Sequence, residues 1–204
     1  MRWTIPVLLA VAAVGYFAAG RPRGAAATEV VDWSRDPIQT PTDRAAFDLD
    51  TRKGRVTVTP RATYDVAAVV ERVEPYWLDA VAFLSPFDLA LAWGEVPTPA
   101  IRDRLDVGQS WRFFFWRTED PSIDVGYVIE HSANTHVIPA NANVRRALGT
   151  IDAGDEVRLH GLLVDVASDR GLTWQTSLVR TDHGDRGCEI VWVESVQIGS
   201  RFYR

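Results

Sequence analysis

"EVRLHGLLVDVA", residues 156–167, is the longest stretch of the sequence with the alternation of apolar and polar residues that a half-buried β-strand produces. Its apolar residues take odd positions up to Leu159 and even positions from Leu162 onward, so the inward face changes at His160-Gly161. A glycine at such a change indicates a β-bulge, and a bulge bends the strand. We therefore expect a long, bent strand over these residues.

Other stretches on both sides of it also predict strands. One begins at Val56, and Tyr64–Val73 fits a helix by its spacing but a strand by its β-branched residues, so we favour the strand. The remaining predicted strands are Trp111–Arg117, Thr173–Arg180 and Cys188–Ile198. The many aromatic residues of the first predict that it is buried in the core, with Trp111 among them. Several strands joined by tight turns predict a small curved antiparallel sheet or a β-barrel similar to the oligonucleotide- and oligosaccharide-binding (OB) barrel.

Short helices between these strands make the expected fold class α+β. Residues 85–86, Ser-Pro, combine a capping serine with a proline at the first helical position, which predicts a helix that ends at Gly94. Residues 98–99, Thr-Pro, repeat this signal, and a third helix is expected over Asn141–Leu148.

The N-terminal residues carry a membrane signal. Trp3–Gly20 is uncharged and mostly apolar, with arginines on both sides, and a bilayer span needs roughly 17–25 such residues. The alanines at 25–27 match a signal-peptide cleavage site, but they lie beyond two arginines, so we expect one uncleaved transmembrane helix rather than a cleaved signal. The predicted organisation is a membrane anchor or signal segment over 1–27, a linker over 28–55 and one globular α+β domain over 56–204.

The charge of the chain excludes one class of partner. The segment 1–27 holds three of the 22 basic residues and none of the 27 acidic ones, so the rest of the chain has a net charge of about −8. A domain that binds nucleic acid shows a basic stripe, and this one does not. We expect a single-pass protein of the cell inner membrane, with its domain on the periplasmic side and an envelope protein or a small ligand as its partner.

Five segments of the chain resemble a family of uncharacterised bacterial proteins that have an N-terminal membrane segment. The segments are SPFDLALAWG (85–94), WRFFFWR (111–117), HSANTHVIPAN (131–141), GDEVRLHGLLVDV (154–166) and TSLVRTDHGDRGCEIVWVE (176–194). The Ser-Ala-Asn-x-His-x-Ile-Pro-Ala block is the most specific part of this resemblance. The family has no assigned activity, so the resemblance implies a membrane-attached protein and no catalytic residues.

The block at 131–141 is the candidate ligand site. If it is extended, Ser132, Asn134 and His136 lie on one face, where they could bind a ligand together. If it is a turn, the same side chains bond to nearby backbone and only stabilise the fold. Trp93, at the end of a predicted helix, is the aromatic candidate for the same pocket.

Two other hypotheses concern metal binding and catalysis. His131 and His136 are five residues apart, which does not match a helical pair of zinc ligands, so we expect no metal and no cofactor. Cys188, the only cysteine, is either a small buried hydrophobic residue or a nucleophile that one of these histidines activates. The sequence thus predicts a membrane-anchored extracytoplasmic binding or interaction protein, with an envelope hydrolase that uses Cys188 as the alternative.

Overall fold

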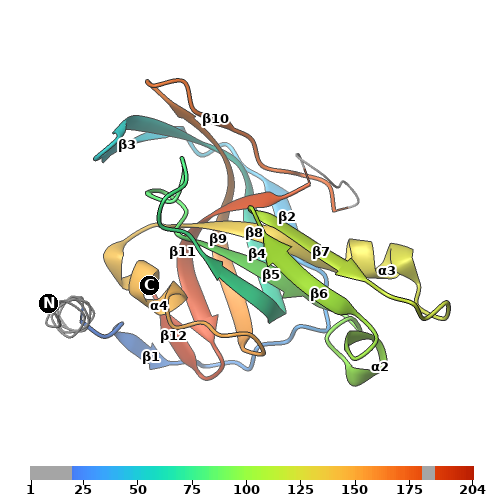
Figure 1. The fold of residues 1–204 in the computed structure, drawn as a ribbon. Coiled ribbons are helices and arrows are strands. Elements are labelled where there is room, and N and C mark those ends of the chain that lie inside the picture. The colour runs from blue at the N-terminus through green and yellow to red at the C-terminus, as the bar shows by residue number, and fades with distance from the viewer. Residues whose placement is uncertain (1–19, 181–186) are drawn as a thin grey trace, which may run out of the picture.

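The computed structural model describes residues 20–180 and 187–204, and its main feature is a curved β-sheet of ten strands (Figure 1). A two-stranded hairpin and a few short helices complete the described part of the chain. The predicted curved sheet is therefore confirmed. The predicted transmembrane helix falls on residues 1–19, outside the described residues, and within the described ranges no helix is long and apolar enough to cross a membrane.

The sheet contains strands from both ends of the described chain. Its strands are β1 (Gly24–Ala26), β2 (Ile38–Pro41), β3 (Phe47–Thr51), β4 (Gly54–Pro75), β5 (Phe87–Ala92), β8 (Ser132–Pro139), β9 (Glu156–Ser168), β10 (Thr173–Trp174), β11 (Glu189–Ile198) and β12 (Arg201–Tyr203). The hairpin consists of β6 (Asp106–Ser110) and β7 (Phe113–Arg117), and the helices are α2 (Pro99–Arg102), α3 (Val125–Glu130) and α4 (Ala142–Leu148).

Five strands form a series of pairings that returns to its start. β4 pairs with β5, β5 with β8, β8 with β11, β11 with β9, and β9 with β4 again. All of these pairs are antiparallel except β8 with β11, so the prediction of a purely antiparallel sheet is wrong at that pair. Parallel neighbours need a crossover connection, and α4, β9 and β10 lie between β8 and β11 in the chain.

β4 is the element that bends the sheet, and both predictions of a strand within it, from Val56 and over Tyr64–Val73, are confirmed. One extra residue at Arg61 shifts its register against β9, and another at Glu71 shifts its register against β5. Because a bulge turns the following side chains to the other face, the residues before and after Arg61 pack into different hydrophobic clusters.

The predicted strand at 156–167 is confirmed as β9, but the bulge predicted at Gly161 is wrong. Gly161 has no left-handed φ, and the extra residue is Glu194 in the neighbouring strand β11. The apparent change of face in the sequence has another cause. Leu163 packs into one hydrophobic cluster and Leu162 into the other, so both faces of β9 are buried beyond the glycine.

The helix predicted over residues 85–94 is wrong, because this segment contains β5. Five of the six residues of β5 are buried, because Leu89 and Leu91 pack into the main core and Asp88, on the opposite face, lies under Arg112 of the hairpin. An apolar run without alternation fits a strand buried on both faces as well as a helix. The helices predicted at 98–99 and over Asn141–Leu148 are confirmed as α2 and α4, whereas α3 was not predicted.

The predicted strand Trp111–Arg117 is only partly confirmed. Trp111 and Arg112 have φ angles of 53° and 65° and form the turn between β6 and β7. Trp111 is 88% exposed, so the expectation that it lies in the core is wrong. The aromatic composition of this stretch suggested burial, but β7 lies in a two-stranded hairpin rather than in the main sheet.

Two further boundaries differ from the prediction. The expected linker 28–55 contains β2 and β3, and both strands pair with β4. The strand expected over Thr173–Arg180 is limited to the two residues of β10. Short strands at the edge of a sheet have few apolar residues, which makes their pattern similar to that of a linker.

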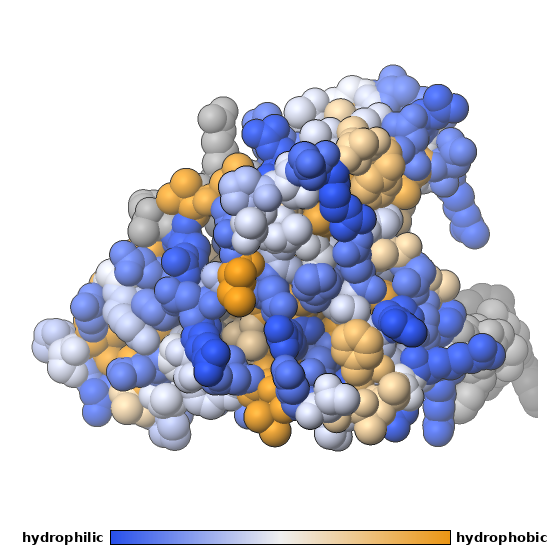
Figure 2. Space-filling view, turned by 180° about the vertical axis from the view of Figure 1, so that it is seen from behind, coloured by the Kyte–Doolittle hydropathy of each residue, from blue (hydrophilic) through white to orange (hydrophobic). Residues whose placement is uncertain are grey.

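Two main hydrophobic clusters lie on the two faces of the long strands. One includes the later part of β4 with α4, and the other includes the beginning of β4 with the later part of β9. The surface seen in Figure 2 is largely hydrophilic, with hydrophobic residues in separate groups. Most apolar side chains of these strands are therefore enclosed between elements of the described chain.

Candidate functional site

The block at 131–141 forms β8, a strand of the sheet, and not a turn. β8 pairs with β5 on one side and with β11 on the other, and its residues from Ala133 to Ile138 are buried. Asn134 and His136 are two residues apart and therefore lie on the same face of the strand. The hairpin of β6 and β7 covers this face.

Asn134 fixes the hairpin to β8. Gln109 in β6 donates a hydrogen bond of 2.8 Å from Nε2 to Asn134 Oδ1. Asn134 Nδ2 in turn donates to the carbonyl oxygen of Arg112, also at 2.8 Å. Asn134 is 4% exposed, and its side-chain amide thus bonds to strand β6 and to the turn of the hairpin.

Arg112 carries the positive charge under the hairpin. Its guanidinium lies 2.8 Å from Asp79 Oδ2 and 2.8 Å from Asp88 Oδ1, and it donates to the carbonyl oxygen of Ser85 at 2.9 Å. Asp88 has no exposed surface, so this pairing compensates a fully buried carboxylate. All three nitrogen atoms of the guanidinium donate to an acceptor, and these bonds fix the tip of the hairpin in place.

Tyr76 packs against this ion pair. Arg112 lies 4.0 Å above the Tyr76 ring, and its backbone N–H donates to the Tyr76 hydroxyl at 2.7 Å. Burial and the nearby negative charge of Asp88 raise the pKa of Tyr76 to about 12. The hydroxyl therefore stays protonated throughout the neutral range.

His136 lies beneath the same cluster and does not reach solvent. Its Nδ1 is 2.9 Å from Asp88 Oδ1, although the ring is not oriented for a well-aligned hydrogen bond. The Trp174 ring lies 4.8 Å from the imidazole ring, and His136 is only 3% exposed. These contacts give His136 a structural position beneath the hairpin.

The other predicted site residues lie apart from this cluster. Trp93 is fully buried in the core cluster, because β5 continues to Ala92 and carries the indole inward. The Ser132 hydroxyl donates to the backbone oxygen of Val128 at 2.6 Å. Of the four ligand-binding candidates, the structure brings together only Asn134 and His136.

The two partners expected for a hydrolase differ in their surroundings. Cys188 Sγ lies 3.7 Å from Asn134 Nδ2, which places the thiol at the edge of the covered face. His131 ends α3, where its ring stacks on Tyr127 at 3.8 Å and its Nε2 lies 3.5 Å from Asp36. Across the described ranges, no group of three or more histidine, cysteine or acidic residues is arranged to hold a metal ion.

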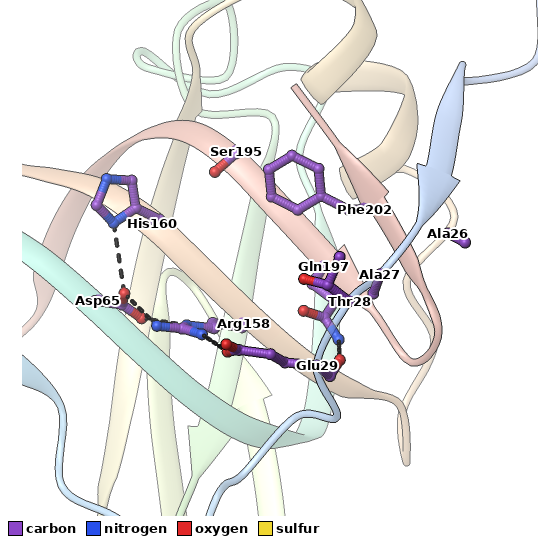
Figure 3. A pocket seen from close by; sticks show the side chains of 10 residues that line it. All are labelled: Ala26, Ala27, Thr28, Glu29, Asp65, Arg158, His160, Ser195, Gln197 and Phe202. Carbon is purple, nitrogen blue, oxygen red and sulfur yellow. Dashed lines mark hydrogen bonds and ion pairs between the residues drawn. The ribbon is translucent and has the colours of Figure 1, made fainter.

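An open cavity of about 480 Å³ lies elsewhere, between the N-terminal residues and the strands β4, β9, β11 and β12 (Figure 3). Arg158 in β9 forms a two-point ion pair with Asp65 in β4, with distances of 2.8 Å and 2.9 Å. Glu29 Oε2 lies 3.3 Å from Arg158 on the other side, and His160 Nδ1 lies 3.5 Å from Asp65. The ion pair with Asp65 is the main cause that raises the pKa of Arg158.

The remaining walls of this cavity add an aromatic ring and hydrogen-bonding groups. Phe202 and Ser195 line the cavity across from Arg158 and Glu29 (Figure 3). Gln197 donates to the backbone oxygen of Glu29 at 2.7 Å, which holds the N-terminal segment against the sheet. The cavity thus combines charged groups, one aromatic wall and partial access to solvent, which are features of small-ligand sites.

The sequence contained part of the signal for this second site. Arg158 and His160 are two residues apart in a predicted strand, so the alternation of faces already placed both side chains together. Asp65 lies opposite His160 in the register of β4 and β9, and Glu29 is 129 positions from Arg158 in the chain. No local pattern predicts that these distant residues meet.

The chain matches no protein-family model, no curated protein and no solved structure in comparisons with known proteins.

Proposed function

We propose that this protein is a membrane-anchored binding protein of the bacterial envelope, whose cavity at Asp65, Arg158 and His160 binds a small polyhydroxylated ligand such as a sugar. The arrangement of the Asp65–Arg158 ion pair in an open cavity is the observation that carries the proposal. Carboxylate oxygens accept hydrogen bonds from hydroxyl groups, and guanidinium groups donate to them. The Phe202 ring offers an apolar surface for the C–H face of a sugar ring.

The size and charge of the cavity favour this class of ligand. A volume of about 480 Å³ lies within the range of roughly 300–1,000 Å³ for small-molecule sites. Arg158 is already paired with two carboxylates, Asp65 and Glu29, so a third anion gains little from it. A neutral ligand with many hydroxyl groups bonds to both members of the pair without separating them.

We further propose that the sheet is an OB-like barrel. The series β4–β5–β8–β11–β9–β4, its single parallel pair and the position of α4 between β8 and β9 support this proposal. OB barrels bind ligands on the face of their second and third strands, which correspond to β5 and β8. Here the hairpin covers that face, which favours the cavity on β4 and β9 as the ligand site.

The buried position of His136 also favours binding over hydrolysis. A general base must come within hydrogen-bond reach of the substrate. His136 is 3% exposed and lies under the Arg112 cluster, so a substrate reaches it only if the hairpin is displaced. A hydrolase that uses Cys188 with His136 therefore requires a large rearrangement, whereas binding in the open cavity requires none.

The contacts of the first described residues support an uncleaved anchor. The alanines at 25–27 of the candidate cleavage site include two residues of β1, which pairs with β12. Ala26 and Ala27 also line the proposed ligand cavity. Cleavage at this position would remove one wall of the cavity, so the intact chain is the form that we expect to bind ligand.

Titration calorimetry on the full-length protein tests the proposal. The protein is kept in a detergent without a sugar headgroup and titrated with glucose, N-acetylglucosamine and their disaccharides. We expect saturable binding of at least one saccharide, and loss of this binding in Arg158→Gln. Arg61→Gln is the matched control, because Arg61 forms an ion pair with Asp165 at 3.4 Å and does not line the cavity.

Two results would contradict the proposed function. If none of the saccharides binds to the wild-type protein, the ligand class is wrong. If a saccharide binds equally well to Arg158→Gln and to the wild type, the site is wrong. A circular dichroism spectrum of each variant shows whether the fold is intact.

A further inference from the structure

A second cavity, of about 1,030 Å³, lies beside the point where the described chain begins. We call it the N-terminal groove, and its lining includes Arg21, Val73, Trp77, Phe87, Arg146 and Leu148. Gly20, the last residue of the apolar segment Trp3–Gly20, is also part of the lining. The groove is therefore next to the end of the predicted membrane anchor.

Large apolar side chains next to this groove are exposed. Trp77 is 79% exposed and Leu78 is 97% exposed, and both lie in the loop between β4 and β5. Exposure of two neighbouring large apolar side chains to water is unfavourable, and such an exposed patch indicates an interaction site. Tryptophan is enriched at the boundary between bilayer and water, where its ring contacts both apolar and polar groups.

The arginines of the groove lack acidic partners. Within residues 20–180 and 187–204, no ion pair joins the guanidinium of Arg21 or Arg146 to a carboxylate, and Arg146 Nε is a buried donor without an acceptor. Asp152 is the acidic residue in the lining. Elsewhere in the described chain, arginine commonly pairs with carboxylates, as in Arg44, Arg55, Arg61, Arg102, Arg104, Arg112, Arg117, Arg158 and Arg180.

We infer that the N-terminal groove and the Trp77-Leu78 loop lie on the membrane surface and bind anionic phospholipid. The phosphate groups of the lipid supply the acceptors that Arg21 and Arg146 lack, and the apolar walls accept the upper part of an acyl chain. The inference rests on the proposed anchor, because Gly20 then emerges at the bilayer surface and holds the groove there. Local positive charge allows this contact although the chain as a whole is acidic.

Tryptophan fluorescence in reconstituted vesicles tests the inference. The full-length protein is inserted into vesicles of phosphatidylcholine, with or without phosphatidylglycerol, in which the acyl chains carry bromine as a quencher. Quenching is compared between the wild type, Trp77→Phe and Trp111→Phe. Trp111, at the tip of the hairpin and 88% exposed, is the matched control.

The fluorescence of Trp77 is the difference between the wild type and Trp77→Phe, and we expect bromine to quench it. The fluorescence of Trp111, obtained in the same way from Trp111→Phe, should not change. We also expect stronger quenching of Trp77 with phosphatidylglycerol than without it. The double variant Arg21→Gln and Arg146→Gln should lose this dependence on the anionic lipid. Flotation of the vesicles with bound protein tests the anchor independently.

The outcomes separate the anchor from the groove. If the protein floats with the vesicles but bromine does not quench Trp77, the groove inference is overturned and the anchor stands. If the protein does not float with either kind of vesicle, both are overturned. Protection of Trp77 from aqueous iodide without quenching by brominated lipid means that protein, such as a second copy of the chain, covers the groove, which also overturns the lipid assignment.

Discussion

Arg112 shows how one side chain fixes the position of a whole hairpin. Its backbone has a left-handed φ of 65°, which costs energy for a residue other than glycine. The ion pairs with Asp79 and Asp88 and the hydrogen bond from Asn134 offset this cost. The residue thus couples the turn of the hairpin to the buried carboxylate on β5.

Replacing Arg112 by alanine should lower the free energy of unfolding by about 3 kcal/mol, because it leaves the buried Asp88 without its main counter-charge. Urea unfolding followed by tryptophan fluorescence measures the change. Arg117→Ala is the control and should cost less than about 1 kcal/mol, since the Arg117–Asp106 pair is exposed. The double variant Arg112→Ala and Asp88→Asn should recover part of the lost free energy of unfolding. If the double variant is as unstable as Arg112→Ala alone, the unpaired charge of Asp88 is not the cause of the loss.

The raised pKa of Tyr76 predicts that the protein loses stability at alkaline pH. Its pKa is raised from 10 to about 12 in the folded protein, so the folded state retains a proton that the unfolded state releases. The contribution of Tyr76 is present below pH 10 and is lost as the pH rises towards 12. We expect the free energy of unfolding to decrease over this range, and to decrease less in Tyr76→Phe.

Tyr64 is the second tyrosine that contributes in the alkaline range. Burial raises its pKa well above the ordinary value, so Tyr76→Phe should reduce the pH dependence without abolishing it. Urea unfolding at a series of pH values from neutral to alkaline checks both points. Identical pH profiles for the wild type and Tyr76→Phe would show that the Tyr76 hydroxyl is not held in its protonated form.

At the scale of elements, the close approach of β9 and β11 depends on Gly161. A Cβ atom at this position would overlap the backbone oxygen of Trp192. Glu194, the bulged residue of β11, lies just beyond this contact. The glycine is therefore required by the approach of a neighbouring backbone, and not by its own φ angle.

Gly161→Ala should accordingly destabilise the protein by about 1–3 kcal/mol, because β11 must move away from β9. Ala167→Val in the same strand is the control and should change stability by less than about 0.5 kcal/mol, since Ala167 is exposed. Thermal unfolding of both variants measures the difference. An unchanged melting temperature in Gly161→Ala would mean that the two strands tolerate a larger separation.

At the scale of the whole molecule, the first and last described strands complete the sheet together. β1 pairs with β12, and the backbone of Glu29 accepts a hydrogen bond from Gln197 in β11. The residues that follow the predicted anchor therefore belong to the folded domain. This arrangement leaves few residues between the predicted membrane segment and the sheet.

A shortened chain that begins at Thr28 should be less stable than one that begins at Gly20, because the first lacks β1 and leaves β12 with an unpaired edge. We also expect the full-length chain to sediment with membranes and the chain from Gly20 to stay in the soluble fraction. Urea unfolding and sedimentation of the two shortened chains check these points. Equal stability would mean that β1 adds nothing to the domain, and aggregation of the chain from Gly20 would mean that the apolar segment belongs to the fold.

The sequence by itself determined the elements whose pattern is local and long. Alternation of apolar and polar residues predicted β9 and the beginning of β4, β-branched residues predicted the later part of β4, and the Thr-Pro capping signal predicted α2. These signals are reliable because strand alternation and helix capping depend on neighbours in the chain. The same alternation placed Asn134 with His136, and Arg158 with His160, on common faces.

Only the tertiary structure decided which of these polar faces is open. The face of Asn134 is covered by a hairpin from another part of the chain, whereas that of Arg158 lines a cavity. The apolar run of β5 does not identify it as a strand, because burial on both faces removes the alternation of apolar and polar residues. Covering, burial and ion pairs between distant residues depend on contacts across the sheet, and a local pattern of residues does not contain that information.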